Sequence, residues 1–229
     1  MDNLIIVGTS KTAKHVYEFV KMHNLYNIVG FAVNEKYKKE DSFLGLPLYT
    51  LENINTEYGS DNFYLFIAVL WNNLNKDRKE LYNYCKSMGY KLANIISPTA
   101  IIRSNIIGDN CWIHDYVIIQ NDAKINANVE MMAFTLIGAN TNIGAHCFFG
   151  ARSLVGGGSS IGEQCFIGIN STIFDDTTIG NKCIIGACTA VKRNIPDYTR
   201  YVTPSDNFVM KQYGEEEIES KLQFAKNKR

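Results

Sequence analysis

The sequence lacks an excess of charge of either sign and any apolar run long enough to cross a membrane. Its 23 Lys and Arg residues equal its 23 Asp and Glu residues in number, so the formal net charge is zero. Proteins held to nucleic acid or to a membrane surface by bulk charge carry a basic excess that is missing here. The N-terminal stretch MDNLIIVGTSKTAKH also lacks the basic and long apolar segments of a secretory signal. We therefore expect a cytoplasmic protein with no nucleic-acid partner and no membrane insertion.

Paired cysteines of the metal-binding or redox type are missing too. None of the six cysteines forms a Cys-x-x-Cys motif. Most of them occupy one position of the repeat described below, where a small buried side chain in a reducing compartment is expected. The sequence therefore predicts no metal site.

What the sequence does have is an unbroken six-residue period in its second half. Every sixth residue is large and apolar, at Ile95, Ile101, Ile107, Ile113, Ile119, Ile125, Met131, Ile137, Ile143, Phe149, Val155, Ile161, Ile167, Ile173, Ile179, Ile185 and Val191. Neither an α-helix nor a β-strand gives this spacing by itself. A fixed period of six is typical of a solenoid of the parallel β-helix kind.

Two further positions of the repeat support this prediction. Glycine often follows the apolar residue, as at Gly138 and Gly168, and we expect it at a tight corner because it has no Cβ and tolerates a positive φ. Four residues after the apolar position the side chain is small, as at Cys147 and Cys165, because a narrow prism has little interior space.

The first part of the chain alternates strand and helix patterns. Residues 2–7, 28–33, 63–69 and 91–96 are expected to form strands, and residues 13–24 and 75–89 helices, which predicts a small parallel α/β domain. We divide the chain into a Rossmann-like domain (1–94), a β-helix (95–196) and a C-terminal return segment with a helix (197–229).

The hexad array resembles that of the hexapeptide-repeat, left-handed β-helix acyltransferases. The segments LIIVGTSKTAKHV, IVGFAVNE, LGLPLYTLENI and GYKLANIISPTA are similar to those of sugar N-acyltransferases with an N-terminal Rossmann-like domain, of the bacillosamine and sialic-acid pathway type. The resemblance implies a homotrimer that binds acyl-CoA between neighbouring β-helices and a nucleotide-linked amino sugar in the first domain. It implies N-acylation of that sugar, with acetyl as the expected group, for surface glycan biosynthesis.

The nucleotide sugar is expected at the carboxyl ends of the first two strands. The turn Gly8-Thr9-Ser10-Lys11 joins a strand to a helix N-terminus, whose N–H groups and dipole suit a diphosphate. An ordinary strand–helix turn remains an alternative, because the turn is not a full GxGxxG. Asn34 stands where the family tends to carry an acidic residue that contacts the base or ribose.

The family's catalytic segment resembles V-x-H-[DE]-x-x-I-G and corresponds here to LIGANTNIG. Ala139 therefore replaces the catalytic histidine, Asn140 the acidic residue beside it, and Phe148 a second histidine. The family's paired glycine is retained at Gly157 and Gly158. If three hexads make one coil, Gly157 stacks beside Ala139, and we expect its N–H to stabilise the oxyanion.

His114, or failing it Glu130, is the candidate to assist the amine in place of the missing histidine. The resemblance implies that the corner of His114 faces a neighbouring subunit's groove. Asn121, Asp122 and Asn140, on the facing corner, are expected to orient the sugar. Two alternatives stay open: His114 is only a corner residue, or no side-chain base is needed.

The other histidines are expected to have no such role. His15 and His23 belong to the first helix as surface or packing residues, and His146 to a solvated corner that it shares with Asn128.

The acyl-CoA contacts follow from the resemblance alone. They are expected at Phe148, Gly157, Ile169 and Ala187, with Lys192 near the CoA phosphates or simply part of a solvated basic turn. O-acylation of a sugar, or a non-catalytic β-helix that binds nucleotide sugars, remain alternatives. The sequence does not show which nucleotide base, which sugar or which acyl chain the protein uses.

Overall fold

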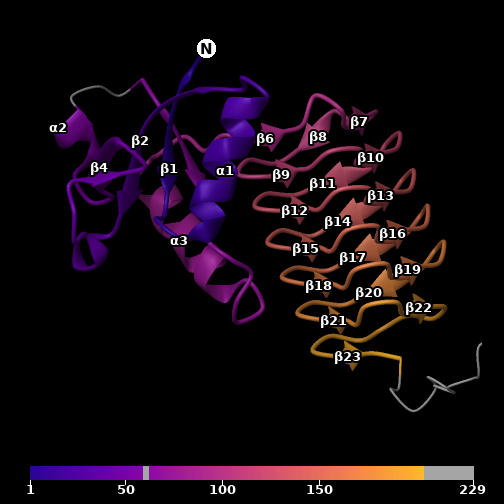
Figure 1. Cartoon of the computed structure of the whole chain (residues 1–229). Coiled ribbons are helices and arrows are strands. Elements are labelled where there is room, and N and C mark those ends of the chain that lie inside the picture. The colour runs from indigo at the N-terminus through magenta and orange to yellow at the C-terminus, as the bar shows by residue number, and fades with distance from the viewer. Residues whose placement is uncertain (59–61, 204–229) are drawn as a thin grey trace, which may run out of the picture.

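A computed structural model describes residues 1–58 and 62–203. The α/β domain and the β-helix lie side by side, and the coils of the β-helix stack one below another from β7 to β23 (Figure 1). The helix expected near the C-terminus lies outside the described residues. Among residues 1–58 and 62–203, no helix is long and apolar enough to span a membrane.

The first domain is built on a five-stranded sheet in the order β3-β4-β2-β1-β5. Only β3 is antiparallel to its neighbour. The elements are β1 (Asn3–Val7), α1 (Lys11–Met22), β2 (Asn27–Val33), the 3-10 helix η1 (Glu35–Tyr37), β3 (Ser42–Phe43), β4 (Leu46–Thr50), α2 (Ile54–Tyr58), β5 (Tyr64–Ile67) and α3 (Lys76–Ser87). The other predicted strands and helices of this part are confirmed to within a few residues, but the strand predicted at 91–96 is reduced to a single bridge at Leu92 and the two-residue β6 (Ile95–Ile96), which belongs to the β-helix. The elements η1, β3, β4 and α2 were not predicted.

The β-helix has three parallel sheets, and each coil contributes a two-residue strand to each sheet. The β9 sheet contains β6 (Ile95–Ile96), β9 (Trp112–Ile113), β12 (Glu130–Met131), β15 (Phe148–Phe149), β18 (Phe166–Ile167), β21 (Ile184–Ile185) and β23 (Arg200–Tyr201). The β10 sheet contains β7 (Ile101–Ile102), β10 (Ile118–Ile119), β13 (Leu136–Ile137), β16 (Leu154–Val155), β19 (Thr172–Ile173) and β22 (Ala190–Val191). The β11 sheet contains β8 (Ile106–Ile107), β11 (Lys124–Ile125), β14 (Asn142–Ile143), β17 (Ser160–Ile161) and β20 (Thr178–Ile179).

Residues 18 positions apart in sequence stack in successive coils, as expected. Ile119 pairs with Ile137 and Ile137 with Val155, and all three are fully buried. The predicted left-handed β-helix with an apolar interior is therefore confirmed.

Of the two properties expected to place glycine at the corner, the positive φ was wrong, whereas the need for a missing Cβ is confirmed. The positive φ falls two residues later in the hexad, for example at Asn128 (59°), His146 (61°) and Gly158 (67°). Gly138 is required for another reason: an added Cβ would lie 2.5 Å from the backbone nitrogen of Gly157 in the next coil. These glycines allow the backbones of successive coils to approach closely at the corner.

The cysteines of the repeat are packing residues, as predicted. Cys111, Cys147, Cys165 and Cys183 are fully buried, whereas Cys188 is exposed. The Cys147 thiol donates to the carbonyl of Gly162 over 3.1 Å. These thiols therefore fill the interior and satisfy backbone carbonyls.

We expect a thiol reagent at pH 8 to modify Cys188 alone in the native protein and all six cysteines in denaturant. Burial raises the pKa of Cys85 to about 12 and that of Cys111 to about 11, so both stay protonated and unreactive. Peptide mapping after labelling identifies the modified residue. Rapid native labelling of any buried cysteine would contradict this packing.

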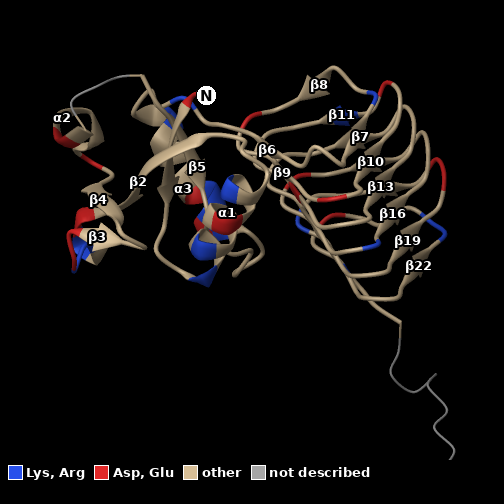
Figure 2. Cartoon of the chain, turned by 45° about the horizontal axis from the view of Figure 1, so that its top comes forward, with Lys and Arg blue, Asp and Glu red and all other residues tan. Residues whose placement is uncertain are grey.

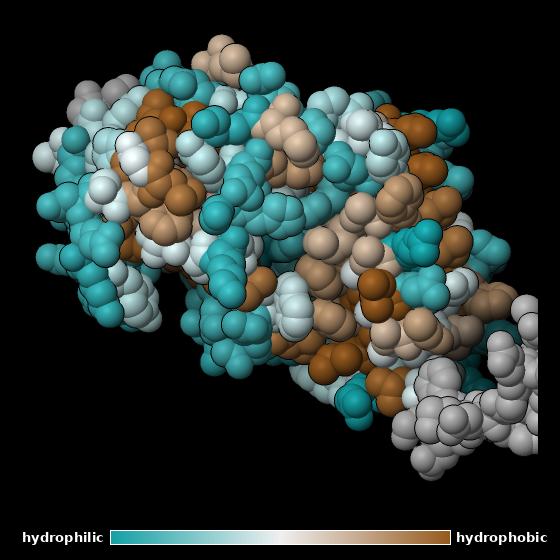
Figure 3. All heavy atoms as spheres, in the orientation of Figure 1, coloured by the Kyte–Doolittle hydropathy of each residue, from teal (hydrophilic) through white to brown (hydrophobic). Residues whose placement is uncertain are grey.

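The three outer faces of the β-helix differ in character. The β11 sheet is polar, with Lys124, Asn142 and Thr178 pointing outward. The β10 sheet is apolar, and its outward Ile101 and Leu154 are 48% and 36% exposed. Hydrophobic side chains gather over the β-helix, while charged residues lie mainly on the first domain and at the corners of the coils (Figures 2 and 3).

The third face, the β9 sheet, packs against the first domain through α1 and α3. Trp112 is 2% exposed and its ring lies 5.8 Å from that of Phe19 on α1. On α3, Arg78 forms a buried ion pair with Glu130 over 3.2 Å. The two domains therefore share a core that positions the cavity described next.

Candidate active site

A cavity of about 280 Å³ lies between the start of α1 and the β9 sheet. Its lining consists of Lys11, Thr12, His15, Leu70, Trp71, Trp112, His114, Glu130, Met132 and Phe148. The cavity thus brings together four residues predicted for three different roles: Lys11, His114, Glu130 and Phe148.

Local chemistry fixes the turn that opens α1. Ser10 is the N-cap residue, and its hydroxyl accepts a hydrogen bond from the Thr12 N–H over 3.2 Å. Gly8 has a φ of 124°, and an added Cβ would lie 3.1 Å from the Ala68 carbonyl oxygen at the end of β5. Thr9, Ser10 and Lys11 are exposed at the carboxyl end of β1. This is where open α/β sheets bind their ligands.

His114 lies at the inner end of the cavity, beneath the chain's own first domain. It is 5% exposed and stacks on Trp112 at a ring distance of 4.1 Å. Burial, and next to it the nearby His15, lowers its pKa to about 4, so its imidazole is neutral at pH 7. Its Nε2 is buried without a hydrogen-bond partner and lies 3.9 Å from a carboxylate oxygen of Glu130.

Glu130 is already committed to another partner. Its carboxylate accepts a hydrogen bond from Arg78 Nη1 over 3.2 Å, and the side chain of Arg78 is 1% exposed. Burial raises the pKa of Glu130, while the charge of Arg78 opposes this shift. The carboxylate therefore serves mainly to neutralise Arg78 in the shared core.

Aromatic rings form one wall of the cavity. Phe148 stacks on Phe166 at 5.2 Å, and the ring of Trp71 lies 5.4 Å and 5.1 Å from these two rings. Trp71 is 40% exposed, so the wall continues to the surface. Such a wall suits an apolar group such as the acyl part of a thioester.

The corner that holds Ala139 lies on another edge of the β-helix. Its predicted stacking is present, because the Gly158 N–H donates to the Ala139 carbonyl over 2.9 Å. However, the Gly157 N–H, the expected oxyanion donor, already donates to Asp175 Oδ1 over 2.7 Å. The sequence pattern alone did not reveal this carboxylate.

The remaining predicted residues do not line this cavity. Asn121, Asp122 and Asn140 are exposed at the corner of Ala139. Ile169 and Ala187 are exposed, and Lys192 is also exposed, with its ammonium group 5.2 Å from the ring centre of Phe174. Within one chain these groups do not reach His114.

Asn34 lines a different cavity, of about 460 Å³, at the carboxyl ends of β2 and β5. Tyr37 and Tyr84 are part of the same lining. The Asn34 side-chain N–H₂ donates to Glu52 over 3.0 Å, which fixes the orientation of the amide. An oriented amide between two tyrosines suits a base or a ribose.

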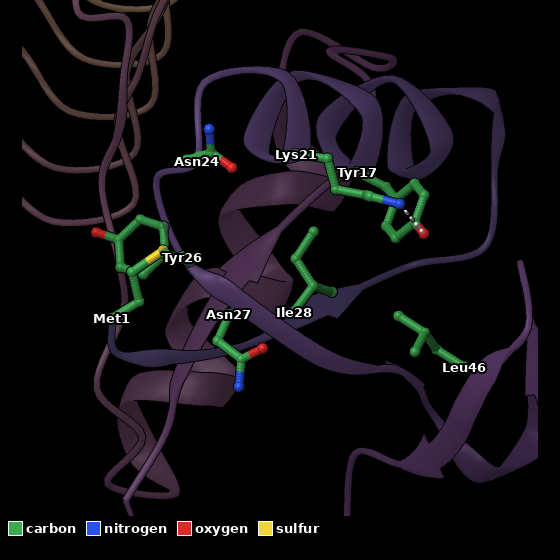
Figure 4. A pocket seen from close by; sticks show the side chains of 8 residues that line it. All are labelled: Met1, Tyr17, Lys21, Asn24, Tyr26, Asn27, Ile28 and Leu46. Atoms are coloured by element: carbon green, nitrogen blue, oxygen red, sulfur yellow. Dashed lines mark hydrogen bonds between the residues drawn. The ribbon is translucent and has the colours of Figure 1, made fainter.

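A larger cavity of about 560 Å³ lies at the opposite, amino-terminal edge of the sheet (Figure 4). There the Lys21 ammonium donates to the Tyr17 hydroxyl over 3.2 Å, and the Tyr26 hydroxyl donates to the Asn94 carbonyl. Its lining contains neither an acid–base group suited to acyl transfer nor a strand end of the ligand-binding kind. Among the described residues no cluster of His, Cys, Asp and Glu could hold a metal ion.

His15 and Trp71 line the cavity although the sequence did not mark either as a site residue. His15 lies four positions after Lys11, so both lie on the same helix face, and this spacing was an available signal. Trp71 precedes α3 in an irregular segment, and no periodicity marked it.

Comparisons with known proteins agree with this architecture. Residues 158–193 match the family "Bacterial transferase hexapeptide (six repeats)", and residues 140–158 match "Hexapeptide repeat of succinyl-transferase". No curated protein matches the chain significantly.

Several solved structures share the fold over nearly their whole length. PerB from Caulobacter crescentus, in complex with CoA and GDP-perosamine, is 24% identical, with a TM-score of 0.75 over 89% of this chain and 95% of that one. The acetyltransferase domain of PglB from Neisseria gonorrhoeae, in complex with acetyl-CoA, is 21% identical (TM-score 0.74, 88% and 96% covered). WeeI from Acinetobacter baumannii is 16% identical (TM-score 0.75, 87% and 96% covered). The chain therefore carries bacterial-transferase hexapeptide repeats and shares the two-domain, left-handed β-helix fold of these structures.

Proposed function

We propose that the protein transfers an acyl group from acyl-CoA to the amine of a nucleotide-linked amino sugar. The observation that carries this proposal is the single cavity that joins the start of α1 to His114 and Phe148. It is supported by the fold shared with PerB, whose structure contains CoA and GDP-perosamine. We propose acetyl as the acyl group, the cytoplasm as the location, and surface glycan synthesis as the setting.

The nucleotide sugar is proposed to bind along the carboxyl edge of the five-stranded sheet. The turn Gly8-Thr9-Ser10-Lys11 would hold the diphosphate through backbone N–H groups, the helix dipole and the ammonium of Lys11. Asn34 would contact the base or ribose. The sugar would then extend over the first turn of α1 into the cavity.

The reaction makes three demands on the cavity. A neutral amine must attack the thioester carbonyl, a donor must stabilise the oxyanion, and a proton must leave the nitrogen. The aromatic wall of Trp71 and Phe148 would keep water from the thioester. Neutral His114 would meet the amine at the inner end, with Glu130 beside it.

We propose that a homotrimer completes the site. The residues Asn121, Asp122, Asn140, Gly157, Ile169, Ala187 and Lys192 lie away from the cavity of their own chain. They would reach acyl-CoA and the sugar only from a second copy, with CoA between neighbouring β-helices. The apolar β10 sheet is the face best suited to contact another copy.

The bond between Asp175 and Gly157 supports a second candidate, a non-catalytic nucleotide-sugar-binding β-helix. In that case the Gly157 N–H, which is the expected oxyanion donor, would stay bonded to Asp175 and would stabilise no oxyanion. Sugar O-acylation is disfavoured, because a hydroxyl is a poorer nucleophile than an amine and needs a base more.

The experiment that tests the function combines acetyl-CoA with UDP-, GDP- and dTDP-linked amino sugars and follows the release of free CoA thiol. We expect turnover with one of these sugars and a rise in melting temperature with each true ligand. Stabilisation by a nucleotide sugar without turnover would favour the non-catalytic candidate. No effect of any acyl-CoA would contradict the transferase.

Lys11→Gln is expected to raise KM for the nucleotide sugar roughly tenfold, because a charge-assisted contact to phosphate is worth more than about 1.4 kcal/mol. The affinity for acetyl-CoA should stay unchanged. Lys14→Gln is the matched control, since Lys14 lies on the same helix, is exposed and pairs with Glu18. Equal KM values for the two variants would contradict a diphosphate site at Lys11.

A further inference from the structure

We propose that His15 is the catalytic base that accepts the proton lost by the sugar amine. This inference rests on the proposed function and deepens it. Nothing in the repeat pattern points to His15, because it belongs to the first domain and not to the β-helix.

The position of His15 gives it access to both ends of the cavity. It lines the cavity, its side chain is exposed, and its ring lies 5.2 Å from Trp112 and 6.0 Å from His114. Lys11 precedes it by one helical turn, which is a rise of about 5.4 Å. A diphosphate at the start of α1 therefore places the attached sugar beside His15.

The other two candidates in the cavity are less suited to accept a proton. His114 is 5% exposed, and burial lowers its pKa to about 4, so it is a weak base at neutral pH. Glu130 is held by Arg78 over 3.2 Å. Histidine is the side chain that ordinarily titrates near neutral pH, and a general base works best there.

His114 has a different part in this arrangement. Its Nε2 is buried, aimed toward Glu130 and without a hydrogen-bond partner, so the inner end of the cavity has an unmet polar group. A neutral imidazole there could contact the amine and hold it toward His15. His114 is thus a positioning residue.

The charged and titratable groups around His15 come from two elements. On α1 they are Lys11 and Glu18, which lie four positions before and three positions after it. From the β-helix they are His114 and Glu130, which line the same cavity. The bound diphosphate would pair with the cation of Lys11, which leaves the imidazole of His15 to face the sugar.

The proposed step is balanced in atoms and charge. The amine nitrogen forms a bond to the thioester carbonyl carbon, and the nitrogen proton passes to the imidazole of His15. The tetrahedral intermediate collapses, the carbon–sulfur bond breaks, and the thiolate of CoA leaves. The proton on His15 then passes to the sulfur, which gives the N-acyl sugar and free CoA.

The test is the pH dependence of kcat/KM for wild type and His15→Gln. We expect turnover of His15→Gln at pH 7 to fall about 100-fold or more, within the usual range for loss of a general base. The pH profile of the variant should differ from that of wild type, and added imidazole should restore part of the rate. Calorimetric affinities for acetyl-CoA and the nucleotide sugar should stay close to wild type.

His23→Gln is the matched control, because His23 lies at the other end of the same helix and contacts Asp115. It should keep the wild-type pH profile. Two results would overturn His15 as the base. The first is a His15→Gln variant with the wild-type pH profile, and the second is a variant that binds the nucleotide sugar more weakly but keeps its turnover. Failure of wild type to turn over any amino sugar would instead contradict the proposed function itself.

Discussion

Replacing Arg78 with alanine is expected to lower the free energy of unfolding by about 3–5 kcal/mol. Arg78 is 1% exposed and forms an ion pair with Glu130, which is 7% exposed. Its guanidinium also donates to the Asn110 carbonyl over 3.3 Å. Without it, a buried carboxylate and a buried carbonyl lose their partner, and both lie at the contact between the two domains.

Urea unfolding of Arg78→Ala measures this loss. The double variant Arg78→Met, Glu130→Met is the matched control, because apolar residues of similar size often replace a buried ion pair without loss of stability. Lys79→Ala is a second control and should cost less than about 1 kcal/mol, since its pair with Glu163 is largely exposed. A double variant as unstable as Arg78→Ala would show that packing, and not the unpaired charge, sets the cost.

Acidification from pH 6.5 to pH 4 is expected to remove about 3 kcal/mol of stability through His114 alone. Its pKa is about 4 in the folded protein, against 6.5 for the free side chain. Between these values the unfolded chain binds more protons than the folded one, so stability falls as pH falls. Above pH 6.5 and below pH 4 this contribution no longer changes with pH.

His146 is also expected to make the protein less stable as the pH falls. Burial, and next to it the charge of Lys79, lowers its pKa to about 4. Its Nδ1 lies 2.8 Å from the Asn128 side-chain nitrogen, and the ring of Tyr82 covers it at 5.3 Å. The expectation of a solvated corner was therefore wrong for His146, because α3 covers that corner.

Unfolding in urea at a series of pH values measures how much His114 and His146 contribute to the loss of stability at low pH. The double variant His114→Asn, His146→Gln should be less stable overall but should show a much flatter pH dependence between 4 and 6.5. The slope is the decisive quantity, because it reports proton uptake and not packing. Equal slopes for the double variant and wild type would rule out both histidines as its source.

The fold of the β-helix could be predicted because every six-residue repeat has its large apolar residue at the same position, and this position sets the register. A column such as Ile119, Ile137 and Val155 follows from the period alone, without knowledge of any distant contact. The short elements β3, β4 and α2 could not be predicted in this way, because they are too brief to show a period. The corner glycines were recognised and their missing Cβ was expected to matter, but the neighbouring coil that a Cβ would strike does not show in a single hexad.

The site was only partly predictable, because it lies where two independently patterned domains meet. Lys11 and His114 could be selected within their own domains from the strand–helix turn and the corner position. Their meeting in one cavity, and the presence of His15 between them, depends on how α1 packs on the β9 sheet. The contact of the Asp175 carboxylate with the Gly157 N–H could not be predicted for a similar reason, because Asp175 belongs to the next coil.

The 18-residue coil also constrains how the gene of this protein can change in length. Gain or loss of 54 nucleotides within the array adds or removes one complete coil and leaves every column aligned. Gain or loss of 18 nucleotides keeps the apolar interior but turns all later coils by one third. After a loss, the polar β11 face would continue where the apolar β10 face had been; after a gain, the apolar β10 face would continue where the polar β11 face had been. In both cases any surface shared by several coils would be split. We therefore expect natural length variants to differ by whole coils.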